Sequence, residues 1–122
     1  AAIGATATAQ IEAAGVTCVR LSGSTRYITS LSVAGHGITQ GLGWTGCGIA
    51  TGVTYADALS GGAAQGALGS VLVLTPGESL DPDVAKVLYA KRDSLVRVRM
   101  FGGPNAIGDV TRSQVAAIVR SP

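Results

Sequence analysis

The sequence has few aromatic side chains and few charges. Of its 122 residues, 4% are aromatic and 13% are charged, which is about half the charged share of an average soluble domain. Nine Lys and Arg against seven Asp and Glu leave a net charge of +2, so we expect no nucleic-acid partner. The most apolar stretch, residues 61–74, is interrupted by Gln65, Ser70 and glycines and is shorter than the ~20 residues of a membrane span. We therefore expect no membrane insertion.

Side chains that carry catalysis or hold metals are equally scarce. The single histidine, His36, lies between two glycines, and no serine–acid–histidine order can be built around it. Neither Lys86 nor Lys91 follows a glycine as in a Walker loop, and no dinucleotide fingerprint follows an apolar run. Two cysteines are too few for a structural zinc site; Cys18 and Cys47 are either small buried residues or a disulfide pair. We predict no catalytic residue, no metal site and no cofactor, and hence no enzyme.

What the sequence does contain is 18 glycines and four short apolar runs. Each run is followed at once by a glycine-containing turn, and the stretches between the runs are long enough for a helix. This is the pattern of βαβ units. It predicts a three-layer α/β/α sandwich of the Rossmann-like type, with a parallel sheet of about four strands and ligands at the carboxyl ends of the strands. The predicted strands are 16–21, 48–50, 70–74 and 96–101.

The composition of two strands predicts their place in the sheet. Residues 71–74 are apolar throughout, which predicts a central strand. Residues 96–100 alternate between apolar side chains and Arg97 and Arg99, which predicts a strand at an edge or covered on one side. The glycine-rich segment 41–48 is predicted to be a loop in which Trp44 forms a lid or an exposed contact.

The helices are predicted from caps and apolar spacing. Asp81 and Pro82 predict one helix start, because aspartate caps helices and proline suits the first turn. Asp57 is either the N-terminal cap of an earlier helix or a buried partner of Arg20 or Arg26. The other two helices are expected at 26–38, which glycines weaken, and at 55–68.

The chain repeats itself at an offset of 104 residues. Ala2-Ile3-Gly4 recurs as Ala106-Ile107-Gly108, and three further positions match in the same register: Gln10 with Gln114, Ile11 with Val115 and Ala13 with Ala117. This period is longer than the 20–50 residues of solenoid repeats. We therefore predict that residues 1–15 are the closing helix of a preceding repeat and that residues 16–122 form one module of a tandem array.

Four ordered motifs resemble those of the type 2 cell-wall-binding repeat family. They are an Arg-Leu-Ser-Gly and Arg-Tyr run within residues 19–30, Tyr55-Ala56-Asp57-Ala58-Leu59-Ser60, an apolar strand closed by Thr75-Pro76, and Phe101-Gly102-Gly103 before Ala106-Ile107. Together they cover residues 19–120.

The resemblance implies a small parallel α/β fold likened to Toprim domains and a non-catalytic role. Such modules occur in tandem arrays on secreted proteins of Gram-positive bacteria, where they anchor a protein to the cell wall by binding anionic secondary polymers. It thus implies an extracellular, cell-surface location, with sibling modules as partners. The alternative is a structural or protein-interaction repeat with no polymer site of its own. The candidate polymer-binding residues are Arg20, Arg26, Tyr27 and Asp57 at motif positions, and Arg97 and Arg99 as an alternative basic site.

Overall fold

A computed structural model of the chain describes residues 3–122. Over these residues the fold is mixed α/β, with five helices, one short 3₁₀ turn and a three-stranded sheet. In chain order the elements are α1 (Ala5–Ala13), α2 (Arg26–Thr39), β1 (Gly43–Thr51), α3 (Ala56–Ala67), β2 (Ser70–Thr75), α4 (Pro82–Lys91), the 3₁₀ turn Arg92–Ser94, β3 (Arg99–Phe101) and α5 (Asp109–Val119).

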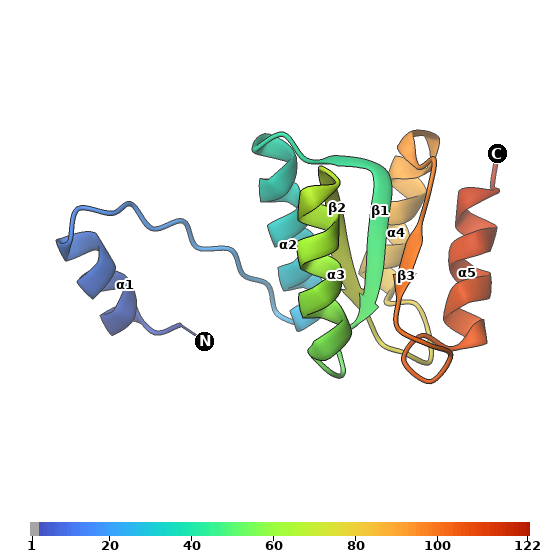
Figure 1. Cartoon of the computed structure of the whole chain (residues 1–122), viewed down its shortest axis with the longest axis horizontal. Coiled ribbons are helices and arrows are strands. Elements are labelled where there is room, and N and C mark those ends of the chain that lie inside the picture. The colour runs from blue at the N-terminus through green and yellow to red at the C-terminus, as the bar shows by residue number, and fades with distance from the viewer. Residues whose placement is uncertain (1–2) are drawn as a thin grey trace.

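The sheet is parallel and its strand order is β2-β1-β3. Ile49 in the middle of β1 lies opposite Val73 of β2 and Met100 of β3. Helix α3 covers one face of the sheet, and α2 and α4 cover the other, with α5 beside β3 (Figure 1). The core between these layers is built from fully buried side chains, the largest apolar ones being Ile49, Leu88 and Ile107. All three strands therefore end at the same edge of the sheet.

The predicted start of the helix at Asp81 and Pro82 is confirmed. The Asp81 carboxylate accepts from the backbone N–H groups of Asp83 and Val84, at 3.0 and 3.2 Å, and so caps α4. Helix α2 begins at a Thr25 cap and continues to Thr39 despite its glycines. The helix packs along β2, and its Ser30 hydroxyl accepts from the backbone N–H of Leu74 (3.0 Å). Tertiary contact thus outweighs weak helix propensity.

Strand β1 is longer than predicted. It begins at Gly43, inside the segment predicted to be a glycine-rich loop, and Trp44 is a half-buried strand residue packed against the core. The loop prediction was wrong because Gly43–Gly48 carries little apolar signal. The tight packing of Gln65 and Leu72 against Gly48 favours glycine there for steric reasons.

The predicted central position of residues 71–74 was also wrong. β1 is the central strand, and β2 lies at an edge of the sheet. β2 is nonetheless apolar throughout because α2 packs on one of its faces and α3 on the other. The predicted edge position of the fourth strand is confirmed for β3, which is shorter than expected.

Residues 16–21 do not form a strand of the sheet, so three strands stand where about four were predicted. This segment is extended and mostly exposed, and it connects α1 to α2 outside the folded body (Figure 1). The local pattern is that of a strand, but no strand within residues 3–122 pairs with it. We call residues 3–21, comprising α1 and this segment, the arm. The motif residue Ala2 lies outside the described residues.

Candidate functional site

The loops that follow the three strands enclose a hollow of about 570 Å³ at the carboxyl edge of the sheet. Edges of this kind are where open parallel sheets bind ligands. The hollow is lined by Thr51 at the end of β1 and by residues from each loop: Val53 and Thr54 after β1, Pro76, Gly77, Glu78 and Ser79 after β2, and Pro104, Asn105, Ala106 and Gly108 after β3.

The loop after β2 is held in place by hydrogen bonds to its neighbours. The Gly77 carbonyl accepts from the backbone N–H of Gly108 (2.8 Å) and from the hydroxyl of Thr111 (3.0 Å), both at the start of α5. The buried Thr75 hydroxyl donates to the Ser79 carbonyl (3.2 Å) and accepts from the backbone N–H of Asp81 (2.8 Å). These bonds fix the rim of the hollow before any ligand arrives, which lowers the ordering cost of binding.

The groups around the hollow suit a ligand with hydroxyls and negative charge. Thr54 and Ser79 bring hydroxyls and Asn105 brings an amide, all of which can exchange hydrogen bonds with a sugar. Helices α3 and α5 both begin at this edge with no side-chain cap, so their first N–H groups can donate to a ligand, although each first turn already holds one carboxylate, Asp57 in α3 and Asp109 in α5. Glu78 is the one carboxylate on the lining, and it lies on the loop after β2.

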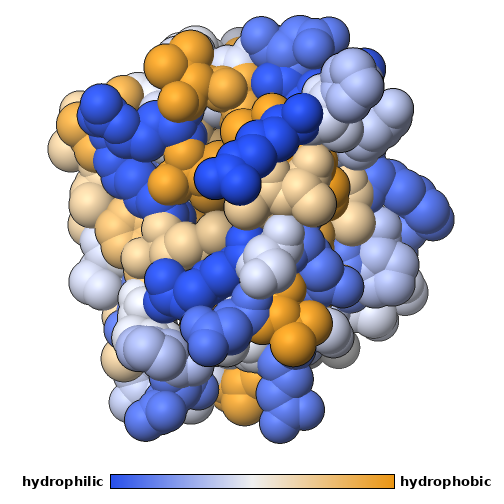
Figure 2. Space-filling model, turned by 90° about the vertical axis from the view of Figure 1, so that its right-hand side faces the viewer, coloured by the Kyte–Doolittle hydropathy of each residue, from blue (hydrophilic) through white to orange (hydrophobic). Residues whose placement is uncertain are grey.

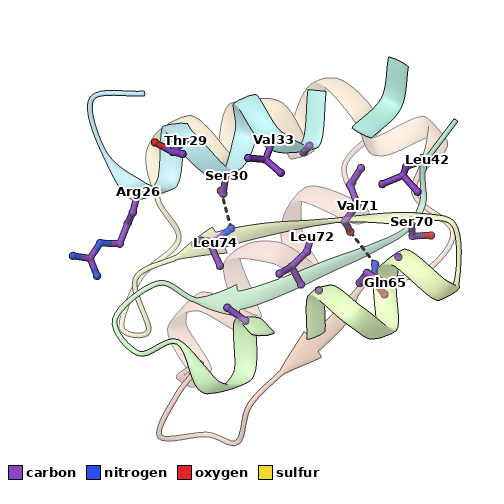
Figure 3. Close-up of a pocket in the computed structure, with 14 residues that line it drawn as sticks. Arg26, Thr29, Ser30, Val33, Leu42, Gln65, Ser70, Val71, Leu72 and Leu74 are labelled. Atoms are coloured by element: carbon purple, nitrogen blue, oxygen red, sulfur yellow. Dashed lines mark hydrogen bonds between the residues drawn. The ribbon is translucent and has the colours of Figure 1, made fainter. Parts of the chain in front are cut away.

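Two of the predicted residues lie near this edge. Arg26 is exposed at the start of α2, and its guanidinium donates to the Gly52 carbonyl just past the end of β1 (2.5 Å). Figure 3 shows its side chain pointing outward from the first turn of α2. Tyr27 packs closely against Gly52 and the core. Arg26 therefore offers its remaining donors to solvent, whereas Tyr27 is half-buried and structural.

Asp57 also lies at this edge, but in neither of its two predicted roles. The N-cap of α3 is Tyr55, and Asp57 lies in the first turn of the helix. In the described part of the chain the one ion pair joins Lys86 to Asp83, so Asp57 has no arginine partner there. Its carboxylate lies against Gly102. A Cβ at this position would lie 2.6 Å from Asp57 Oδ2, and the φ of +112° also favours glycine there.

The other three predicted residues lie elsewhere. Arg20 is on the arm, where it donates to the Ile3 carbonyl and to the Thr8 hydroxyl, both at 2.8 Å. Arg97 is exposed just before β3, at the opposite end of the sheet from the hollow. Arg99 is half-buried and donates to the Gly46 carbonyl (3.0 Å) and the Gln65 amide oxygen (3.4 Å). The six residues therefore do not form one site.

Sequence reasoning identified the edge of the sheet but missed the polar residues on it. Thr54, Ser79 and Asn105 are ordinary loop residues, and nothing in their types distinguishes them from other loop positions. Their one available signal is position, because each lies a few residues after a strand and before a helix.

The two cysteines are free thiols in different environments. Cys18 is half-buried on the arm, and Cys47 is fully buried in β1, where burial raises its pKa from 9.0 to about 12. Within residues 3–122 no three His, Cys, Asp or Glu side chains gather as a metal site would require. No helix in that range is both long and apolar enough to span a membrane.

Comparison with known proteins identifies one family. The family model described as cell wall binding domain 2 matches residues 20–112, which include β1, β2 and β3 and the loops around the hollow. No curated protein and no solved structure matches the chain.

Proposed function

The chain belongs to the cell wall binding domain 2 family, and from this premise we propose that it is a non-catalytic module that binds an anionic polymer of the cell wall. The polymer lies across the carboxyl edge of the sheet, with sugar hydroxyls in the hollow and a negative group near Arg26. Binding there anchors the protein of which the module is part to the surface of a Gram-positive cell.

The observation that carries the proposal is the grouping at this edge. Arg26 lies beside the end of β1, two helices without side-chain caps begin there, and the hollow between the loops includes hydroxyl and amide groups among its lining residues. Charge-assisted hydrogen bonds from an arginine and from helix N-termini favour phosphate or carboxylate groups. The scarcity of aromatic residues argues for this polar mode and against stacking on sugar rings.

We also propose that the module is one of a tandem array, and the arm supports this. Helices α1 and α5 begin 104 residues apart, at Gly4 and Gly108, whose backbone angles agree closely (φ −77° and −69°, ψ 168° and 167°). α5 buries Thr111 and Val115, whereas α1 buries none of its residues. We take α1 to be the equivalent helix of a preceding module, so that residues 1–15 belong with that module and residues 16–122 with this one.

Co-sedimentation with purified Gram-positive wall sacculi tests the function. We expect the protein to pellet with intact sacculi, to remain in solution after acid extraction of the anionic polymers, and to bind less as salt rises. Arg26→Gln is expected to weaken binding by about tenfold, the loss of one charge-assisted contact. Arg120→Gln, which removes an exposed arginine at the far end of α5, is the matched control. Equal binding to extracted sacculi would overturn the proposal.

Arg97 and Arg99 define a second possible site, at the opposite end of the sheet from the hollow. Arg99 already donates to Gly46 and Gln65, which leaves Arg97 as the freer cation. Arg97→Gln in the same assay separates the two sites, since our proposal predicts near-normal binding for this variant.

A further inference from the structure

An apolar groove of about 590 Å³ runs along the outer edge of β2. Figure 3 shows its construction, with Thr29, Ser30 and Val33 of α2 on one side, Leu72 and Leu74 on β2, and α3 on the other side. The lining from α3 consists of small residues together with Gln65, and Arg26 at one end is the one charged residue on the lining. The groove therefore has two walls, one from α2 and one from α3, and a mainly apolar interior.

The edge of β2 that borders this groove has no strand partner. Within residues 3–122, β2 pairs with β1 alone, so the other side of β2 ends the sheet. Soluble proteins usually protect such an edge with charges, proline or a covering segment, because an open edge accepts a further strand. β2 itself carries neither charge nor proline, since its sequence is Ser-Val-Leu-Val-Leu-Thr, and its one described side-chain partner at this edge is the Ser30 hydroxyl, which accepts from the N–H of Leu74. The outer edge of β2 can therefore accept a further strand.

The handedness of the fold predicts where residues 16–21, the segment expected to be the first strand, would join the sheet. The chain passes from β1 to β2 through α3 on one face, and from β2 to β3 through α4 on the other. α2 lies on the same face as α4 and leads into β1. A right-handed crossover through α2 must therefore start from the outer side of β2. The segment that precedes α2 is residues 16–21.

The sequence of residues 16–21 fits a groove with two walls. Val16, Cys18, Val19 and Leu21 put apolar groups on both sides of an extended chain, as in strands covered on both faces. In the single chain Val16 is 55% and Val19 63% exposed, whereas Cys18 and Leu21 are half-buried beside α1. A strand in the groove would place one face against α2 and the other toward α3.

The helix of the arm also fits. Neighbouring strands lie about 4.8 Å apart and packed helices about 8–10 Å apart. α3 contacts β1 and β2 equally, and it is the one described helix on its face of the sheet. The next helix along that face would therefore lie over or just beyond a strand added to β2. α1 already packs on residues 18–20 of the arm, and Ile11 of α1 and Leu59 of α3 both present exposed apolar side chains.

We propose that the groove is a strand-acceptor site that receives residues 16–21 of a second copy of this chain, with α1 of that copy beside α3. After the turn that precedes α2, the arm runs away from the folded body (Figure 1). The backbone N–H of Gly23 donates to the Thr29 hydroxyl (3.0 Å), and Gly23 packs against Ile28. Because these contacts hold the turn, the arm reaches the groove of another molecule, an exchange of strands between copies.

The opposite edge of the sheet is a poorer acceptor. The hollow beside β3 is about 240 Å³, is lined on one side by α5 and includes Arg112 and Arg120. Figure 2 shows the side of the molecule that carries α5, where apolar groups are interspersed with polar ones. This edge lacks the second wall that residues 16–21 require.

Light scattering across a concentration series tests the proposal on the full chain. We expect a concentration-dependent dimer that is lost in Val19→Asp and in Gly62→Met. The Cβ of residue 62 points into open space in the groove, so methionine would fill the groove without disturbing the fold. Gly35→Met is the matched control, because its Cβ also meets open space but lies outside the groove. A monomeric wild type, or equal loss of dimer in all three variants, would overturn the proposal.

Cysteine cross-linking identifies the edge and the partner. Leu72→Cys on β2 is expected to form an intermolecular disulfide with native Cys18, because cysteines on paired strands come within the ~7 Å Cα separation that a disulfide needs. Val98→Cys, in the hollow beside β3, is expected to form none. A disulfide in the Val98→Cys variant and none in the Leu72→Cys variant would contradict docking of a second copy at β2. A bond from Cys18 to the thiol introduced at position 72 of the same chain would contradict it equally. Neither readout depends on polymer binding.

Discussion

The packing of α3 on the sheet centres on one buried polar residue, Gln65. Its amide group donates to the Gly46 carbonyl of β1 (2.6 Å) and the Val71 carbonyl of β2 (2.8 Å), and its oxygen accepts from Arg99 (3.4 Å). The side chain is 1% exposed. Buried polar groups stabilise a structure when all are paired and destabilise it when one partner is removed. Gln65 thus determines how α3 is placed over the strands.

We expect Gln65→Met to lower the free energy of unfolding by roughly 1–3 kcal/mol, because the Gly46 and Val71 carbonyls lose the amide donor and Arg99 loses one of its two acceptors. Gln40→Met, at the exposed end of α2, is the control and should change stability little. Urea denaturation followed by circular dichroism measures both. Equal stability of Gln65→Met and the wild type would show that the network contributes no net stability.

Cys47 makes stability depend on alkaline pH. The folded state holds its pKa at about 12, whereas the unfolded chain titrates near 9.0, so between these values the unfolded state loses a proton that the folded state keeps. The free energy of unfolding therefore falls as pH rises through this window. We expect a shallower fall in Cys47→Ala than in the wild type or in Cys18→Ala, measured by urea denaturation from about pH 8 to 11, within that window. Parallel curves for all three proteins would exclude this role for Cys47.

At the scale of elements, α3 lies close to the sheet because of a glycine. A Cβ at Gly61 would lie 2.7 Å from the ring of Phe101, whereas a Cβ at Gly66 meets nothing within 4 Å. Gly61 therefore permits close packing of α3 against Phe101, whereas Gly66 leaves space beside the groove.

This difference predicts opposite effects of one substitution. We expect Gly66→Ala to stabilise the fold by about 0.5–1 kcal/mol, through helix propensity alone. Gly61→Ala gains the same propensity but is expected to destabilise the fold by about 1–3 kcal/mol, because Phe101 must move. Thermal unfolding of both variants checks the signs. Stabilisation by both would mean that α3 can move away from β3 without cost.

Elements could be predicted from sequence wherever their signals were local. The cap at Asp81 and the apolar run 70–74 gave α4 and β2 nearly to the residue. The pattern of residues 16–21 was interpreted in the same way, yet no strand forms, since strand formation also needs a partner edge. The prediction that residues 71–74 form the central strand was wrong for a related reason. The apolar composition of a strand shows that both of its faces are covered, but it does not show whether both of its edges are paired.

At the scale of the whole molecule, the two ends of the sheet differ in what they offer a ligand. The carboxyl edge combines Arg26, two helix N-termini and the hydroxyl-lined hollow, whereas the opposite end carries Arg97 and Arg99. Sequence reasoning predicted ligands at the carboxyl ends and named arginines at both ends. It could not place them, because the distance between Arg26 and Arg97 is set by the fold and not by spacing along the chain.

The measurement that tests our central claim most directly is an NMR titration of the labelled full chain with wall polymer released from sacculi by mild acid. The account predicts amide shifts at Arg26, Thr54, Ser79 and Asn105 that saturate with polymer and weaken as salt rises. Arg26→Gln should reduce them, and Arg120→Gln should leave them unchanged. Shifts confined to Arg97 and Arg99, or none at any polymer concentration, would contradict polymer binding at the carboxyl edge.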